Sequence, residues 1–278
     1  MTEAVSLVAG AAQELEAKSA YGFDVEHSAI LGAYVRQGQS ISMRQTFAKE
    51  HEYILLGGGS SGAVDVDLAI LDSNGRAVAA DIGNDPTPVV KFRPAASGMY
   101  EIRLVLARSR LAGNFVAVAM MREGGYSIPR ASIIASFSKT LSGATRLAGH
   151  PQIQSRGGLI FHEQRNWSFY ATVLKPKEQT SYSGLRLVSS PTLILAGADE
   201  SASNIDLVVE DTNTSRVVGK DDAPDATPLV VLNTVDATHH YRVKVENAAS
   251  RGASLVTMLV LDTGGGDGTS RPALAAPF

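Results

Sequence analysis

The chain has no cysteine, and this absence excludes several classes of site together. Thiol nucleophiles, zinc–thiolate centres, iron–sulfur clusters and disulfides all require cysteine. The sequence also lacks a run of about 18 apolar residues, so it predicts no transmembrane segment. The formal net charge is −3 and both signs are interspersed, so no basic stripe offers the surface that nucleic acid needs. We therefore expect no nucleic-acid partner.

Recognisable catalytic motifs are missing as well. There is no Gly-x-Ser-x-Gly elbow and no His-Glu-x-x-His motif. The glycine-rich run 57–62 resembles a phosphate loop but lacks its lysine, and we interpret it as a flexible hairpin between two strands. A Ser/His/Asp triad assembled only by the fold is left open as a minor alternative. The sequence favours a protein that is not an enzyme and requires no cofactor.

What the chain does contain is β-forming apolar residues. Hydrophobic residues make up 44% of the chain and charged residues 19%, as in ordinary globular proteins, while aromatic residues make up only 6%. Val, Ile, Leu, Ala and Thr supply most of the apolar character, and such β-branched and small side chains fit half-buried strands. A length of 278 residues corresponds to one large domain or to two of about 100–150 residues each.

An internal repeat divides the chain into two homologous units. Residues 65–74 match residues 204–213 at a separation of 139. Residues 85–90 match residues 225–230 at a separation of 140, and residues 100–104 match residues 241–245, each starting with Tyr, at a separation of 141. Single-residue loop insertions produce such an ordered increase, and coincidence does not. Two copies of one structural module are therefore predicted.

Apolar and polar residues alternate with period two within each unit. Val66, Leu68 and Ile70 share one face of a predicted strand, and Asp67 lies on the other. Short strands recur every 8–12 residues, with turn residues between them. This pattern predicts an all-β fold of two tandem antiparallel β-sandwich domains.

Two segments have helical spacing of their apolar residues instead, residues 3–20 and residues 131–147. Each precedes its unit by a similar distance, so we expect a short helical lead-in to belong to the repeat. The predicted domains are a first sandwich over residues 1–126 and a second over residues 127–263. The glycine-rich stretch that follows predicts a flexible tail over residues 264–278.

A family resemblance rests on strand and turn segments of the first unit, residues 38–40, 53–57, 65–68, 72–75, 88–94 and 98–103. In this order they resemble the bacterial pre-peptidase C-terminal (PPC) domain family. The second unit resembles a more divergent copy. It has His239 and His240 where the family would place a glycine before Tyr241.

The resemblance implies small jelly-roll-like sandwiches of the kind appended to secreted hydrolases or surface proteins. Some members of the family bind calcium, and others bind extracellular polymers such as collagen. No protease domain accompanies the two units here, so the resemblance implies a stand-alone role.

Acidic residues form the first candidate site. The carboxylates of Asp65, Asp67, Asp72, Asp206 and Asp211 are hard oxygen ligands of the kind that Ca²⁺ takes. The alternative, which the sequence favours, is that Asp72 and Asp211 fix turns by accepting hydrogen bonds from their own backbone. Asp67 and Asp206 are then outward-facing strand positions.

Loop acids and an aromatic group form the second candidate site. Asp81, Asp85, Asp221 and Asp225 lie in matching loops and are candidates for a ligand-facing rim, with a merely solvated loop as the alternative. Trp167 and Tyr170 belong to a dense aromatic group that would suit a stacking or docking platform. The interpretation that the sequence favours is that Trp167 and Phe169 are partly core and that only Tyr170 faces outward, by alternation.

These observations predict a non-catalytic extracytoplasmic binding or scaffolding protein whose partner is a protein or an extracellular polymer. Two linked modules would raise avidity. The alternative is a calcium-stabilised surface or matrix structural protein that self-assembles, and homo-oligomerisation is left open. The first residues show no signal-peptide pattern, which fits either a cytoplasmic protein or a mature form whose signal peptide has been replaced by Met1. We expect the secreted or periplasmic mature form, with a cytoplasmic location as the alternative.

Overall fold

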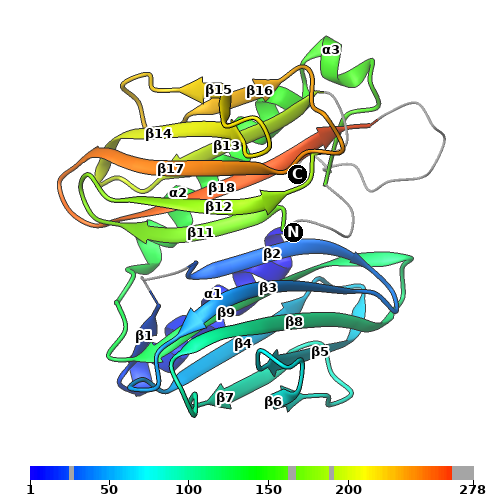
Figure 1. The fold of residues 1–278 in the computed structure, drawn as a ribbon, viewed down its shortest axis with the longest axis vertical. Coiled ribbons are helices and arrows are strands. Elements are labelled where there is room, and N and C mark those ends of the chain that lie inside the picture. Colours follow the sequence, from blue (N-terminus) through cyan, green and yellow to red (C-terminus); the bar gives the residue numbers. More distant parts are fainter. Residues whose placement is uncertain (25–27, 162–166, 188–190, 265–278) are drawn as a thin grey trace. The chain divides into compact units, whose positions relative to one another are not determined.

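The structure, a computed structural model, describes residues 1–24, 28–161, 167–187 and 191–264 (Figure 1). It divides into two compact units, unit 1 (Met1–Ile128) and unit 2 (Pro129–Phe278). The expected boundary after residue 126 lies within two residues of this division. The expected flexible tail falls, apart from residue 264, outside the described residues. The predicted all-β sandwich fold is confirmed.

Unit 1 forms two antiparallel sheets in the order β2-β9-β4-β7, with β1 also pairing with β9, and β3-β8-β5-β6. Its elements are α1 (Thr2–Lys18), β1 (Tyr21–Phe23), β2 (Ile30–Arg36), β3 (Ser40–Phe47), β4 (Tyr53–Gly59), β5 (Ala63–Leu71), β6 (Ala77–Asp81), β7 (Val89–Phe92), β8 (Gly98–Ser109) and β9 (Gly113–Glu123).

Unit 2 repeats this arrangement. Its sheets run β11-β18-β13-β16, with β10 also pairing with β18, and β12-β17-β14-β15. Its elements are α2 (Arg130–Ala148), α3 (Pro151–Gln154), β10 (Leu159–Phe161), β11 (Phe169–Leu174), β12 (Gln179–Leu185), β13 (Thr192–Ala198), β14 (Ala202–Asp211), β15 (Arg216–Asp221), β16 (Leu229–Leu232), β17 (Tyr241–Ser250) and β18 (Ser254–Thr263).

The period-two alternation places the core of each sandwich between its two sheets. Val66, Leu68 and Ile70 of β5 are at most 1% exposed, and Leu207 and Val209 occupy the same positions of β14 with no exposure. Each fully buried aliphatic side chain of this kind contributes about 1.5–3 kcal/mol relative to an exposed one. Burial along these alternating strands is therefore the main stabilising contribution within each unit.

The two predicted helical lead-ins are confirmed as α1 and α2, and each packs on one sheet of its own unit (Figure 1). Helix α1 lies on β4 and β9 and buries the alanine and valine residues of one face. A Cβ atom on Gly58 would lie 2.5 Å from Leu7 Cδ2, so glycine permits this close approach. The run from Gly57 to Gly59 is therefore strand β4 beneath a helix, and the expected flexible hairpin is wrong at these residues.

Helix α2 lies on β13 and β18 through small and hydroxyl side chains. Ser136 Oγ donates a hydrogen bond to the Gly197 carbonyl at 2.9 Å, and Thr140 Oγ1 lies 2.6 Å from Thr257 Oγ1. Buried hydroxyl groups need such partners, because leaving one without a hydrogen bond costs about 1–3 kcal/mol. No helix within the described ranges has both the length and the apolar character needed to cross a bilayer.

Candidate binding groove beside helix α2

The loop acids Asp81 and Asp221 hold their own loops in place. The Asp81 carboxylate accepts hydrogen bonds from the backbone N–H groups of Gly83 at 3.0 Å and Val89 at 2.8 Å. The Asp221 carboxylate does the same for the residues that follow it, with Leu229 N at 2.8 Å. In both units one oxygen thus fixes the turn and the other occupies the first N–H of the next strand.

The second pair of loop acids is engaged in the same way. Asp85 accepts from the backbone N–H and the hydroxyl of Thr87 at 2.8 and 2.9 Å, and Asp225 accepts from Thr227 at 2.7 and 3.1 Å. The backbone carbonyl of Asp85 also accepts a hydrogen bond from Val66 N of β5 at 3.0 Å. Asp81 and Asp221 thus use both carboxylate oxygens for the backbone of their loops, whereas the exposed Asp85 and Asp225 use one each. The predicted ligand-facing rim stays a prediction.

The turn interpretation of Asp72 and Asp211 is confirmed. Asp72 Oδ1 accepts from Asn74 N and Arg76 N, both at 2.9 Å, and Asp211 Oδ1 accepts from the equivalent turn of unit 2. Asp65 pairs instead with Arg108, whose Nε lies 3.1 Å from its Oδ2. Across the described ranges, no group of three or more His, Asp or Glu side chains is arranged to hold a metal ion. Among the described residues, the predicted calcium ligands therefore do not form a cluster of three or more acidic side chains.

A few oxygens in these strands are nevertheless buried without a donor. Asp65 Oδ1, Asn204 Oδ1 and Asp206 Oδ1 have no hydrogen-bond partner. Burial, followed by repulsion from neighbouring acids, raises the pKa of Asp206 and of Asp67 above the usual value. Positions 65 and 204 are equivalent in the repeat, so the feature is duplicated.

The predicted aromatic platform is wrong. Trp167 and Tyr170 are each only 4% exposed, and the Tyr170 ring centroid lies 4.3 Å from that of Tyr182. Every residue of β11 is buried, so alternation along this strand brings neither face to solvent. Burial raises the pKa of Tyr170 far above its usual value. These rings belong to the core.

One histidine of unit 2 has carboxylates near both ring nitrogens. His239 Nδ1 lies 2.7 Å from Asp211 Oδ2, and Nε2 lies 3.5 Å from Asp236 Oδ2. The hydrogen bond with Asp211 raises the pKa of His239 above its usual value of 6.5. A general base needs one ring nitrogen directed at a hydroxyl. His239 has neither nitrogen so directed, and it joins the β14–β15 turn to the segment before β17.

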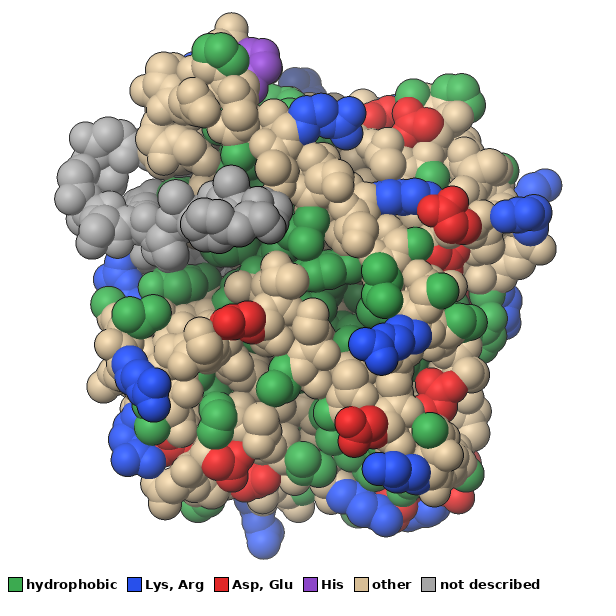
Figure 2. Space-filling model, turned by 180° about the vertical axis from the view of Figure 1, so that it is seen from behind, with side chains coloured by type: hydrophobic (Ala, Val, Ile, Leu, Met, Phe, Trp, Pro, Cys, Tyr) green, Lys and Arg blue, Asp and Glu red, His purple; other side chains and the backbone are tan. Residues whose placement is uncertain are grey.

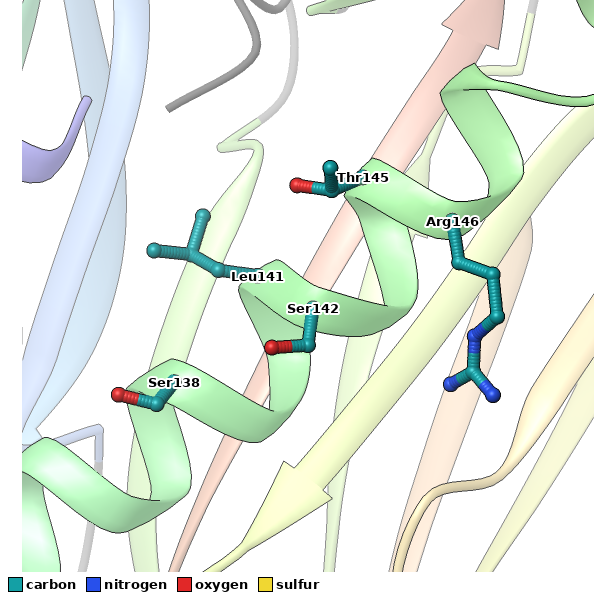
Figure 3. A pocket seen from close by; sticks show the side chains of 5 residues that line it. All are labelled: Ser138, Leu141, Ser142, Thr145 and Arg146. Atoms are coloured by element: carbon teal, nitrogen blue, oxygen red, sulfur yellow. The ribbon is translucent and has the colours of Figure 1, made fainter. Parts of the chain in front are cut away.

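Two hollows lie beside helix α2. The first, of about 530 Å³, is lined by Ser138, Leu141, Ser142, Thr145 and Arg146 (Figure 3). The second, of about 340 Å³, lies where α2 faces β13 and β16, and we call it the α2 groove. Its lining residues are Lys139, Gly143, Arg146, Leu147, Leu195, Ala196, Thr227 and Leu229. Figure 3 shows Arg146 pointing away from the helix face that carries Ser138, Leu141 and Thr145.

The α2 groove combines an apolar floor with cationic side chains. Leu195 and Leu229 come from the sheet, and Gly143 lets the helix approach, since a Cβ there would lie 3.1 Å from Leu195 Cδ1. Lys139 Nζ lies 3.2 Å from Glu200 Oε1. Arg146 is exposed, and no acidic side chain in the described part of the chain pairs with it. Apolar walls with a few polar groups are typical of ligand sites.

Strand β16 borders the groove and ends its sheet in the described part of unit 2. Val231 of β16 is 42% exposed. Its counterpart in unit 1 is Lys91 of β7, whose Nζ lies 2.8 Å from Glu52 Oε1. Sequence reasoning missed both Arg146 and Val231, although the separation of 140 residues already placed a valine opposite a lysine.

The sequence matches no protein-family model and no curated protein. Solved structures with similar folds include PliG of Aeromonas hydrophila, a periplasmic inhibitor of g-type lysozyme. It is 14% identical, with 34% of this chain and 84% of PliG covered and a TM-score of 0.24. The exported protein XepA of PBSX is 10% identical, with 84% of this chain and 86% of XepA covered and a TM-score of 0.27.

A third similar structure is a low-affinity xylan-binding module from Roseburia intestinalis. It is 9% identical, with 36% of this chain and 82% of the module covered and a TM-score of 0.25. At these identities and TM-scores no shared activity follows, because one fold serves many functions.

Proposed function

We propose that the chain is a non-catalytic binding protein that acts outside the cytoplasm, in the periplasm or after secretion, and presents the α2 groove to a protein or an extracellular polymer. The observation that carries the proposal is the exposed Arg146, which has no acidic partner in the described ranges and lies beside an apolar floor. The PPC-like pattern of strands and turns supports an extracytoplasmic binding role.

The engaged acids also support a binding role over catalysis. The carboxylates of Asp81, Asp85, Asp221 and Asp225 serve the backbone of their loops, and His239 lies between two carboxylates. Such groups stabilise the sandwich and are not poised for proton transfer, which requires a base directed at the proton it removes. The α2 groove is instead a place where an anionic ligand with an apolar part gains two favourable contacts.

The test is equilibrium binding to a panel of purified candidates, namely polyglutamate, polygalacturonate, xylan and denatured collagen. Wild type is compared with Arg146→Glu and with Arg130→Glu, a matched control at an exposed position of α2 outside the groove. We expect at least one acidic candidate to bind. Affinity should fall about tenfold in Arg146→Glu, which corresponds to about 1.4 kcal/mol, and by less than about twofold in the control.

Two results would contradict this proposal. One is a panel in which no candidate binds, or in which every candidate that binds has the same affinity for wild type and for Arg146→Glu. The other is shortening of a bound polymer during incubation, because turnover would show that the chain is a hydrolase.

The calcium-stabilised structural protein remains the second candidate. The buried carboxylate oxygens that accept no hydrogen bond favour it. Asp65 Oδ1 and Asp206 Oδ1 are buried in equivalent strands of the two units, and a cation could serve as their partner. A ligand that binds only the folded state stabilises by about 2.7 kcal/mol at one hundred times its Kd. A melting temperature that is equal in EDTA and in millimolar calcium would exclude this candidate.

A further inference from the structure

Strand β16 has main-chain groups that no strand of the described chain uses. Ala196 N donates to Pro228 O, which makes these two residues a hydrogen-bonded pair of the β13–β16 ladder. Hydrogen-bonded and non-hydrogen-bonded pairs alternate in an antiparallel ladder. The N–H and C=O groups of Leu229 and Val231 therefore point away from β13. The Asp221 carboxylate occupies Leu229 N, and Leu229 O and both main-chain groups of Val231 are left at the edge.

Unit 1 protects the same edge, and unit 2 does not. Lysine on an edge strand discourages pairing with another chain, because the added strand would have to accommodate its charge. Lys91 serves this purpose on β7 and is held by Glu52. Val231 replaces the charge with an exposed β-branched side chain, which favours pairing.

The positively charged side chains beside β16 indicate which kind of partner binds at this edge. Arg146 and Lys139 both line the α2 groove, and Arg146 has no acidic partner in the described ranges. A second copy of the chain added across β16 would bring a second groove, and with it a second Arg146, towards this edge, since Lys139 is already paired with Glu200. Like charges brought together oppose association, whereas an acidic segment is attracted. Charge complementarity therefore favours an acidic partner.

We propose that an extended acidic segment of a partner protein adds to β16 as a further strand and places its acidic side chains near Arg146. Strand addition of this kind obtains affinity from main-chain hydrogen bonds and specificity from alternate side chains. Because side chains alternate along a strand, the apolar side chains of the segment lie on the other face of the sheet, next to Val230 and Leu232. This inference rests on the proposed function, because it names the partner class of the same groove.

The probe is a fluorescent peptide in which glutamate and valine alternate over eight residues, titrated into the full chain at low ionic strength. A second peptide of the same sequence carries N-methyl groups on alternate backbone nitrogens and cannot complete a ladder. We expect saturable binding of the first peptide and at least about tenfold weaker binding of the second, since each tenfold corresponds to about 1.4 kcal/mol. A peptide with lysine in place of glutamate should not bind.

Variants locate the binding edge. Val231→Glu puts a charge of the same sign beside the glutamates of the peptide and should weaken binding about tenfold, whereas Val89→Glu, at an exposed position of β7, should change it by less than about twofold. An unchanged melting temperature for both variants shows that they fold. Equal binding of the N-methylated peptide, or binding that Val231→Glu leaves unchanged, overturns strand addition.

The outcomes separate this inference from the proposed function. If polymers bind through Arg146 but the peptide does not, or if the peptide binds only a dimer detected by sedimentation, the strand-addition proposal is wrong and the binding role stands. If neither the polymers nor the peptide binds, both proposals are wrong.

Discussion

The two units share one order of strands and differ in how their cores are filled. In unit 1, Phe47 packs against Tyr53, Phe92 and Tyr100 with ring centroids 4.7, 5.1 and 6.0 Å away. In unit 2 the register places Thr192 at the position of Tyr53. Its hydroxyl donates to a buried aspartate at 2.9 Å. The same fold thus tolerates an aromatic cluster in one copy and smaller side chains with a buried polar contact in the other.

Helices α1 and α2 also differ in the side chains that they bury against their sheets. Five alanine and valine residues of α1 are buried on the sheet of unit 1, whereas α2 buries Ser136, Thr140 and Ala144. Small residues under α2 keep it close to β13, and the α2 groove lies beside this contact. Unit 1 thus combines the fold with an aromatic cluster and an apolar helix contact, while unit 2 combines it with the exposed Val231 and the α2 groove.

The largest effect that would sharpen this comparison is expected from Phe47→Ala. The side chain is fully buried at the centre of the aromatic cluster, so its removal should lower the free energy of unfolding by about 3–5 kcal/mol. Denaturation followed by circular dichroism measures this loss. A free energy of unfolding within about 1 kcal/mol of the wild-type value would contradict a central role of the aromatic cluster in the core of unit 1.

A smaller effect is expected where each helix meets its sheet. Gly197→Ala would place a Cβ atom 2.6 Å from Thr140 Oγ1 and 2.8 Å from Thr140 N, and backbone cannot move aside easily. We expect a cost of about 1–3 kcal/mol. The equivalent Gly58→Ala meets the Leu7 and Val8 side chains and should cost about 1 kcal/mol or less. If urea denaturation gives the same loss in free energy of unfolding for both variants, the two helices approach their sheets equally closely.

The smallest effect concerns the contact that His239 adds to unit 2, where unit 1 has Gly98. Because the pKa of His239 is raised, its contribution to stability is fully present below the usual 6.5 and is lost as pH rises through the raised value. The pKa of Asp211 is lowered, so its contribution is lost only at acid pH, below the usual 3.8. As the pH rises from below 6.5 through the raised pKa of His239, the wild type should therefore lose stability that His239→Gln does not lose.

The readout is the unfolding midpoint followed by Trp167 fluorescence across that range. His150→Gln, at an exposed position after α2, is the matched control and should follow the wild type. If His239→Gln loses as much stability as the wild type on raising the pH, the contact with Asp211 does not carry the effect.

Local patterns in the sequence predicted the fold well. Alternation at Val66, Leu68 and Ile70, the turn acids and the growing repeat separation depend on residues near one another in the chain, so they can be read without the structure. Trp167 and Tyr170 could not be placed in this way, because their burial depends on strands distant in sequence.

The candidate site was predicted less well for the same reason. The α2 groove forms only when α2, β13 and β16 come together, and nothing local marks Arg146 as a groove residue. The loop acids were recognised as a duplicated feature, but their hydrogen bonds to backbone depend on how each loop folds back. Comparison of the two repeats position by position would have revealed the change from Lys91 to Val231.

The most direct test of the division between the units is a chemical-shift map of the ¹⁵N-labelled chain on titration with the alternating glutamate–valine peptide. We predict that the largest shifts lie in the backbone of Leu229–Leu232 and around Arg146, with Val89–Phe92 unchanged. Shifts of equal size on β7, or shifts confined to the loops of Asp81 and Asp221, would contradict the assignment of binding to unit 2.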